Sequence, residues 1–152
     1  MNKYNIVLLI LPILAVIVPC CGKDFICGEN KNKGIITQSI HITNCIDDFI
    51  DTTFIILSEA QLDSLYEQAN CSDTIRPAID FNEHTLLGYF ATGGGCEVQF
   101  IREVTADNSN KKYLYTVKVK ECGWCDKLGY SMNWVLVPKL PENWTVEFTT
   151  QE

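Results

Sequence analysis

Cysteines are the residues of this chain whose type and spacing point most directly to chemistry. Cys122 and Cys125 stand in the motif "CGWC", which has the spacing of thiol–disulfide redox sites. Such sites use a helix N-terminus to lower the pKa of the first thiol, but here a β-rich stretch precedes the motif and Gly129 soon follows it. We therefore predict a structural disulfide in a turn. A redox pair and a metal site are the alternatives, although zinc would need further ligands from His41, His84 or the scattered cysteines.

Six cysteines follow the N-terminal segment, and an even set in an exported chain predicts up to three disulfides. They are Cys27, Cys45, Cys71, Cys96, Cys122 and Cys125. Cys122 and Cys125 could bond to each other, or either could reach Cys96. A bond to Cys96 would close a loop of roughly thirty residues and stabilise the fold by about 3 to 4 kcal/mol. The pairing stays open at this stage, because six cysteines allow many connectivities.

An apolar segment near the N-terminus predicts export. Residues 6–18 carry no charge, follow Lys3 and are interrupted only by Pro12, which is typical of a signal peptide. A transmembrane helix would require roughly 20 apolar residues. We therefore expect this segment to direct export and to be removed.

Two adjacent cysteines, Cys20 and Cys21, end this segment and resemble a bacterial lipobox. A lipobox has a small residue before its cysteine, which Cys20 supplies for Cys21 and Pro19 does not supply for Cys20. We therefore predict acylation of Cys21, with Cys20 as the alternative. Several acyl chains anchor stably, since each buried CH₂ contributes roughly 0.8 kcal/mol. The predicted location is the bacterial cell envelope, at the outer membrane or cell surface, with the membrane as a partner through the lipid anchor.

The rest of the chain is long enough for one domain with its own core. We divide the sequence into a signal peptide at 1–20, a polar tether at 21–34 and a single globular α+β domain at 35–152. The net charge is −7, and no basic stripe or RNA-binding aromatic motif offsets it. Nucleic acid is therefore excluded as a partner.

One helix is predicted at 59–70. Ser58 and Gln61 form a capping box before it, and its apolar residues fall on one face that should cover a sheet. These residues are Leu62, Leu65, Tyr66 and Ala69.

Strand-like segments separated by turn signals account for most of the rest. They lie at 34–43, 53–57, 84–92, 96–105, 112–121, 130–138 and 144–148. In 112–121 the aromatic and β-branched residues alternate with polar ones, so one face is buried and the other wet. The segment "ADNSNKK" before it predicts a hairpin loop. The fold class is therefore α+β: a mainly antiparallel β-sheet of five to seven strands, which could be curled, with one helix packed on it.

Two further clusters have simpler interpretations than catalysis or ligand binding. The stretch "TGGGC" at 92–96 lacks the lysine and the following helix of a phosphate loop, so it predicts a tight, bulged turn with positive φ. Asp47, Asp48 and Asp51 lack the alternating ligands and central glycine of a calcium loop, so they predict a solvated acidic turn.

Histidine and tryptophan complete the candidates. His41 and His84 are expected to be structural, since no nucleophile–base motif accompanies them. Trp124, Trp134 and Trp144 are core candidates, and any exposed one would anchor an interface. We predict no catalytic residue, no cofactor and no metal. The predicted contact surface comprises Gly93, Gly94, Gly95, Trp124 and Tyr130.

A family resemblance adds to these patterns. The stretch "PAIDFNEHTLLGYFATGGGCEVQFIREV", with "YLYTVKVKE" and "WVLVPK" after it, resembles the PrcB C-terminal domain family over residues 77–148. In that family a "DF" turn leads to a strand, a Gly-Gly loop, a long hairpin and a further strand. The resemblance implies a noncatalytic domain, named for a lipoprotein that associates with and stabilises a surface protease complex.

Together these features predict an exported, lipid-anchored domain that binds a protein partner or acts as an accessory to it, without catalytic activity. The anchor would hold it at a membrane, and disulfides would stabilise it outside the cytosol. A thiol–disulfide redox protein using Cys122 and Cys125 is one alternative. A small-ligand carrier with an apolar pocket is another.

Overall fold

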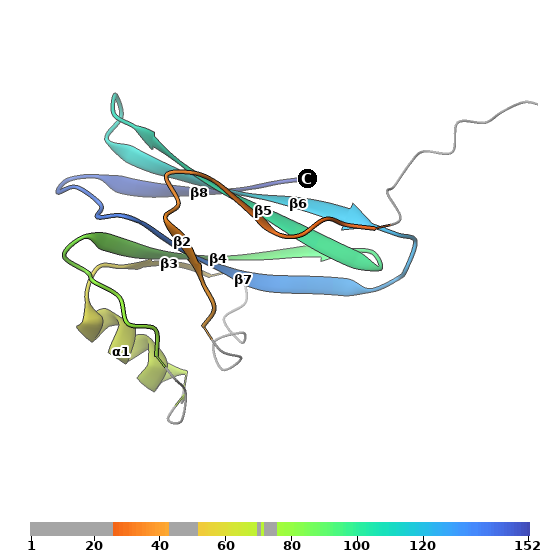
Figure 1. Cartoon of the computed structure of the whole chain (residues 1–152), viewed down its shortest axis with the longest axis horizontal. Coiled ribbons are helices and arrows are strands. Elements are labelled where there is room, and N and C mark those ends of the chain that lie inside the picture. Colours follow the sequence, from red (N-terminus) through yellow and green to blue (C-terminus); the bar gives the residue numbers. More distant parts are fainter. Residues whose placement is uncertain (1–25, 43–51, 70, 72–75) are drawn as a thin grey trace, which may run out of the picture.

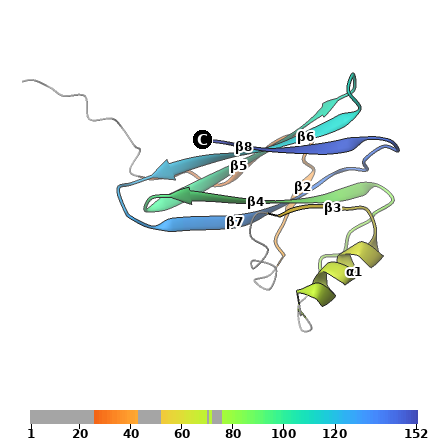
Figure 2. The same cartoon turned by 180° about the vertical axis from the view of Figure 1, so that it is seen from behind.

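Two four-stranded β-sheets and one helix form the fold in the computed structural model (Figure 1), which describes residues 26–42, 52–69, 71 and 76–152. The first sheet has the order β1-β5-β6-β8 and the second β2-β7-β4-β3. The strands are β1 (Lys31–Gly34), β2 (Gln38–Ile40), β3 (Thr53–Ile56), β4 (His84–Gly94), β5 (Glu97–Asp107), β6 (Lys112–Cys122), β7 (Leu128–Pro138) and β8 (Thr145–Gln151), and the helix is α1 (Glu59–Gln68). Both views show three layers, with α1 on the outer side of the second sheet (Figures 1 and 2).

The predicted class with one helix on a largely antiparallel arrangement is confirmed, but the predicted single sheet of five to seven strands is wrong. The described residues contain eight strands in two open sheets. Two of the pairings, β1 with β5 and β6 with β8, are parallel. Alternation along a strand shows which residues are buried, but it does not show in which of two layers the strand lies.

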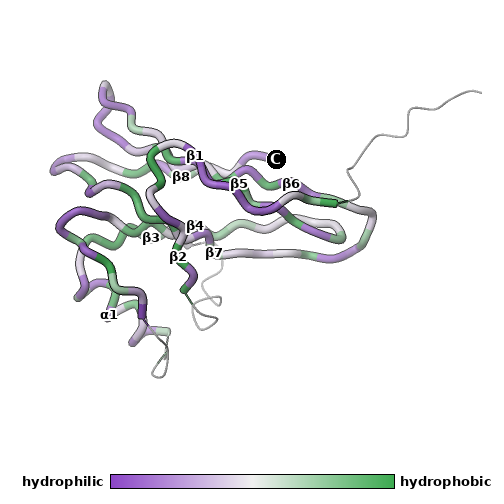
Figure 3. The backbone as a smooth tube through the Cα atoms, in the orientation of Figure 1, coloured by the Kyte–Doolittle hydropathy of each residue, from purple (hydrophilic) through white to green (hydrophobic). Residues whose placement is uncertain are grey.

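The core between the two sheets comes from alternate residues of the four long strands. It contains Leu87, Ala91, Phe100, Val104, Tyr113, Tyr115, Val117, Val119, Val135 and Val137. The predicted alternation in β6 is therefore confirmed, with Lys118 and Lys120 exposed on its other face. Figure 3 shows the same contrast along the strands.

The outer face of the second sheet carries a second core beneath α1. Here Leu86, Trp134 and Leu136 meet the helix residues Leu62 and Leu65. Because both faces of β4 and β7 are covered, their central residues are apolar without alternation, as in "LL" at 86–87 and "WVLV" at 134–137.

The helix begins as the capping box predicts. The Ser58 hydroxyl accepts from the Gln61 N–H at 3.3 Å, and the Gln61 side chain accepts from the Leu57 N–H at 2.7 Å. These contacts satisfy two backbone donors at the start of the helix. The helix ends at Gln68, two positions before the predicted boundary.

The N-terminal part of the described chain belongs to the first sheet. Lys31–Gly34, predicted to lie in the tether, form strand β1 and pair with Ile101–Val104 of β5. Just before it, the Asn30 side chain accepts from the Phe100 N–H at 2.8 Å. All four residues of β1 are exposed, so this edge strand has no apolar face by which sequence could reveal it.

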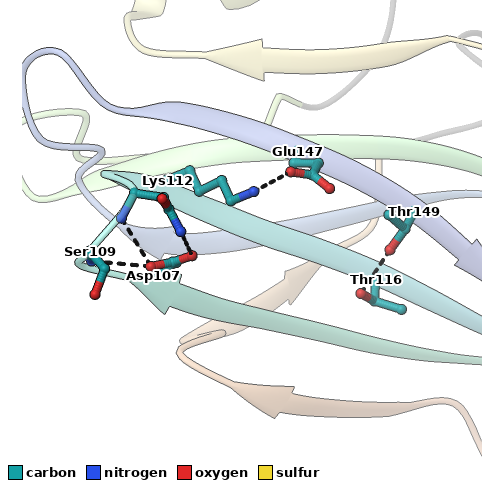
Figure 4. Close-up of polar contacts among 7 residues, drawn as sticks. Asp107, Ser109, Lys112, Thr116, Glu147 and Thr149 are labelled. Carbon is teal, nitrogen blue, oxygen red and sulfur yellow. Dashed lines mark hydrogen bonds and ion pairs between the residues drawn. The ribbon is translucent and has the colours of Figure 1, made fainter.

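The β5–β6 hairpin closes on a polar loop, as predicted (Figure 4). The Asp107 carboxylate accepts from the N–H groups of Ser109 and Asn110 at 3.1 and 3.0 Å. Lys112, at the start of β6, forms an ion pair with Glu147 of β8 at 2.5 Å. Polar side chains thus join β8 to the hairpin at the end of the long strands opposite to Cys96 and Cys122.

Candidate functional site

Two disulfides bind three separate parts of the chain together at one end of the molecule. Cys27 is bonded to Cys122, and Cys96 is bonded to Cys125. The two cysteines of "CGWC" are therefore bonded to other parts of the chain rather than to each other. The bond to Cys96 is one of the alternatives that sequence left open, and the motif lies in the connection between β6 and β7.

We name this end the disulfide tip and define it as Ile26, Cys27, Gly93–Glu97 and Glu121–Tyr130. Backbone hydrogen bonds join its two turns: the Cys96 N–H donates to the Cys122 carbonyl at 2.7 Å, and the Gly95 N–H to the Lys127 carbonyl at 3.0 Å. The Glu121 carboxylate accepts from the Gly94 N–H. Ile26 and Cys27, where the described chain begins, lie at this same end, because Cys27 is bonded to Cys122.

Glycines at two positions of the tip are required by the backbone. Gly95 has a φ of 131° and Gly123 a φ of 75°, values that glycine adopts with little strain. A Cβ atom on Gly123 would lie 2.5 Å from the Cys96 sulfur, and one on Gly95 would lie 2.6 Å from the Cys122 carbonyl oxygen. The prediction of a tight turn with positive φ in "TGGGC" is confirmed at Gly95.

Large apolar side chains are exposed on the tip. The exposed fractions are 75% for Ile26, 65% for Trp124, 72% for Leu128 and 59% for Tyr130. Tyr130 stacks on Phe90 of β4, with ring centroids 6.3 Å apart. Sequence reasoning named Trp124 and Tyr130 as contact residues but missed Ile26 and Leu128. Leu128 falls on the same face of β7 as Tyr130. The alternation that would have indicated this was missed, because the strand was predicted to begin at residue 130.

The predicted contact residues do lie together, but they are not equally accessible. Gly93 pairs with Gly129, and Gly94 with Leu128, across β4 and β7. Gly93 and Gly95 are buried and Gly94 is half-buried, so Gly93 and Gly95 offer little surface to a partner. Trp124 and Tyr130 supply the exposed part of the predicted surface.

The other candidate residues lie away from the tip or outside the described residues. Trp134 is buried and Trp144 half-buried, as core candidates should be. His84 begins β4 opposite Pro138, and His41 is exposed after β2. Cys71 is buried in the core beneath α1 and is also disulfide-bonded. Cys20, Cys21, Cys45, Asp47, Asp48 and Asp51 lie outside the described residues.

Polar groups between the sheets serve the fold. The Tyr115 hydroxyl donates to the Asn133 carbonyl at 2.8 Å, and the Asn133 side-chain amide donates to the Tyr89 carbonyl at 3.2 Å. Burial raises the pKa of Tyr115 on β6, and it lowers the pKa of Arg102 on β5, the neighbouring strand of the same sheet.

An open groove runs between α1 and the edge strand β3. Its volume is about 360 Å³, and Phe54, Ile56 and Leu65 contribute apolar walls. Within the described ranges no helix is long and apolar enough to cross a membrane. Over those same ranges no group of three or more His, Cys, Asp or Glu side chains could hold a metal ion.

Comparison with known proteins gives no relative for this arrangement. No protein-family model matches the chain, and no curated protein or solved structure matches it significantly. Over the residues that the structure describes, the fold defines a disulfide-bonded protein with two β-sheets and one covering helix. Disulfides persist in oxidising compartments, so the two bonds are consistent with a location outside the cytoplasm.

Proposed function

We propose that this protein is an exported, lipid-anchored domain that binds another protein or acts as an accessory to it, and that it performs no chemistry itself. The observation that carries the proposal is the use of the "CGWC" cysteines. Both are bonded to distant parts of the chain, Cys122 to Cys27 and Cys125 to Cys96. A redox pair would need these two thiols to form and break one bond between themselves.

The position of the bonds supports an anchored role. Cys27 joins the start of the described chain to the end of β6, so a pull on the N-terminal segment acts on the first sheet through a covalent bond. Such a link suits a domain that is held by its N-terminus. The proposed anchor is an acylated Cys21, with Cys20 as the alternative.

The exposed apolar side chains support a binding role. Monomeric proteins rarely gather such residues without a partner, and the turns that carry Trp124 and Leu128 are braced by two disulfides. The resemblance to the PrcB C-terminal domain family belongs to the same proposal, because it also implies a noncatalytic domain on a lipoprotein. The fold does not transfer a partner from that family.

Intact-mass analysis of the protein purified from its native envelope tests the anchor. We expect residues 1–20 to be absent and acyl groups to be attached to Cys21. A Cys21→Ser variant should remain unacylated, whereas Cys20→Ser should be processed normally. A natural product that retains residues 1–20, or that carries no acyl group at either cysteine, contradicts lipid anchoring.

Crosslinking in native membranes tests the accessory role. We expect one protein to be crosslinked reproducibly and to lose stability when this chain is deleted. Disulfide exchange with a substrate at "CGWC" would instead support the redox alternative.

A further inference from the structure

The exposed apolar side chains of this protein are concentrated at one end. Six large apolar residues are exposed among the described residues, and four of them, Ile26, Trp124, Leu128 and Tyr130, belong to the disulfide tip. The other two, Ile55 and Leu57, lie at the edge strand β3 and just after it. A concentration of this kind marks a surface that meets an apolar partner.

The tip presents these side chains on a rigid frame. Leu128 and Tyr130 are two positions apart on β7 and therefore share one face of the second sheet, beyond the part of that face where Trp134 and Leu136 meet α1. Trp124 lies in the turn itself. The disulfide-bonded Cys122 and Cys125 flank Trp124 and restrain the backbone of this turn.

The segment that precedes the described structure is continuous with Ile26 at this same end. It comprises residues 1–25, including the uncharged segment 6–18 and both candidate lipid sites. Cys27 follows Cys21 by six positions, so an extended chain between them spans at most ~20 Å. A lipid anchor at Cys21, or at Cys20 one position earlier, therefore keeps the tip close to the bilayer.

We propose that the disulfide tip docks on the lipid bilayer, with Trp124, Leu128, Tyr130 and Ile26 entering the boundary between headgroups and acyl chains. This inference rests on the membrane anchoring of the proposed function and names lipid as the partner of the tip. Tryptophan and tyrosine favour that boundary, because each has an apolar ring and a polar group that stays hydrated. A protein partner would then bind the faces that point away from the membrane.

The charges on the tip favour docking on zwitterionic lipid over docking on anionic lipid. Glu97, Asp126 and Lys127 are exposed there, so the tip carries both signs, and the whole chain has a net charge of −7. Docking should therefore depend on apolar contact and should change little with salt.

Tryptophan fluorescence of the full, naturally processed chain in vesicles tests the docking. The difference between the wild type and Trp124→Phe isolates the signal of Trp124, while the buried Trp134 serves as an internal reference. In phosphatidylcholine vesicles we expect brominated acyl chains to quench Trp124, and acrylamide to quench it at least about twofold less than in detergent-free buffer. The proposal is overturned if acrylamide quenches Trp124 equally in vesicles and in buffer and brominated acyl chains do not quench it.

A matched pair of variants tests whether docking depends on the tip or on any exposed apolar side chain. Leu128→Ser/Tyr130→Ser should restore acrylamide access to Trp124 in vesicles, whereas Ile55→Ser/Leu57→Ser should leave it protected. Disulfide mapping of each variant confirms that the tip has folded. Protection that persists in the first variant, or is lost equally in both, contradicts docking through this surface.

The outcomes distinguish docking from anchoring. A chain without acyl groups whose Trp124 is still quenched on adding brominated vesicles contradicts the lipid anchor and supports docking. An acylated chain in vesicles whose Trp124 stays fully accessible contradicts docking alone. A photo-crosslinker at position 124 that captures a protein in native membranes, with no lipid quenching, assigns the tip to a protein partner and overturns the inference.

Discussion

At the scale of single residues, glycine and sulfur determine the geometry of the tip. Gly123 stands between Cys122 and Trp124 with a positive φ, and its missing side chain leaves room for the Cys96 sulfur. In the core, the buried Tyr115 hydroxyl joins the two sheets by donating to the Asn133 carbonyl. Both positions allow sharp tests by small substitutions.

Gly123→Ala should reduce the yield of the native Cys96–Cys125 bond. The new methyl group would combine a strained φ of 75° with a separation of 2.5 Å from the Cys96 sulfur. Gly94→Ala in the same tip is the control, because its Cβ would be 3.4 Å from the nearest atom, at the far end of the Glu121 side chain. Peptide mapping of oxidised protein measures both; equal yields of native bonds would show that Gly123 is not needed.

Tyr115→Phe should lower the free energy of unfolding by about 1 kcal/mol at pH 7, since it removes a buried hydrogen bond. Tyr113→Phe should cost less, because that hydroxyl is 3.4 Å from its acceptor, the Pro138 carbonyl. Urea unfolding of the two variants measures the difference. A larger loss in Tyr113→Phe would contradict the geometry.

Burial raises the pKa of Tyr115 above its unfolded value of about 10, so the folded state favours the neutral phenol. The corresponding stability is fully present below pH ~10 and is lost as the pH rises further. Tyr115→Phe should therefore show a shallower loss of stability above pH ~10 than the wild type. Urea unfolding between pH 8 and 11 measures the slopes, with mass mapping to confirm that the disulfides are unchanged.

At the scale of elements, each long strand is positioned by what covers its two faces. β4 and β7 lie between the first sheet and α1, so residues on both faces are buried. Trp134 is central to the helix side: it stacks on Phe54 at 5.3 Å and lies over Gly88, where even a Cβ atom would come within 2.4 Å of its ring. The β5–β6 hairpin buries one face in the core between the sheets, and polar contacts from Asp107 hold its loop.

Trp134→Ala should destabilise the protein by about 3 to 5 kcal/mol, because it leaves a large cavity between α1 and the sheet. Trp124→Ala is the matched control, since Trp124 is 65% exposed. This substitution should change the free energy of unfolding by no more than about 0.5 kcal/mol. Thermal and urea unfolding compare the two. Similar losses would indicate that Trp124 is buried in solution.

Asp107→Ala should lower the unfolding midpoint at pH 7, because the carboxylate accepts three hydrogen bonds within its loop. Those bonds to Asn110 and Ser109 lower the pKa of Asp107. Its contribution is therefore present above the unfolded pKa of about 3.9 and is lost as the pH falls through the folded value. The difference from wild type should vanish in strong acid, and Asn108→Ala in the same loop should show no such pH dependence.

At the scale of the whole molecule, two crosslinks of different span brace the tip. The Cys27–Cys122 bond joins residues 95 positions apart, and the Cys96–Cys125 bond joins residues 29 apart. In the chain-entropy model the longer loop stabilises more, by about 4.5 against about 3.5 kcal/mol. The first bond also joins the segment at Ile26 and Cys27 to the end of β6.

Cys27→Ser/Cys122→Ser should therefore lose more stability than Cys96→Ser/Cys125→Ser. Both variants remove one complete bond and leave no unpaired thiol from that bond. Urea unfolding of the oxidised proteins measures the order, and hydrogen exchange in β1 should rise mainly in the first variant. The reverse order would show that native strain or residual unfolded structure outweighs loop entropy.

Much of the local structure could be predicted from sequence, and the reasons are local. The capping box at Ser58 and Gln61, the alternation of Tyr113, Tyr115 and the valines after them, and the polar loop before Lys112 depend on neighbouring residues alone. Strand β1 could not be found in this way, because its four residues are all exposed and its stability comes from pairing with β5.

The sequence by itself determined that the chain has one short helix, several β-strands, an uncharged N-terminal segment and cysteines at set positions. Only the tertiary structure decided that the strands divide into two sheets, that Cys122 bonds to Cys27 and Cys125 to Cys96, and that Ile26, Trp124, Leu128 and Tyr130 share one end. The physical reason is range: caps, turns and alternation act between close neighbours along the chain, whereas sheet order and disulfide pairing depend on contacts between residues far apart in it.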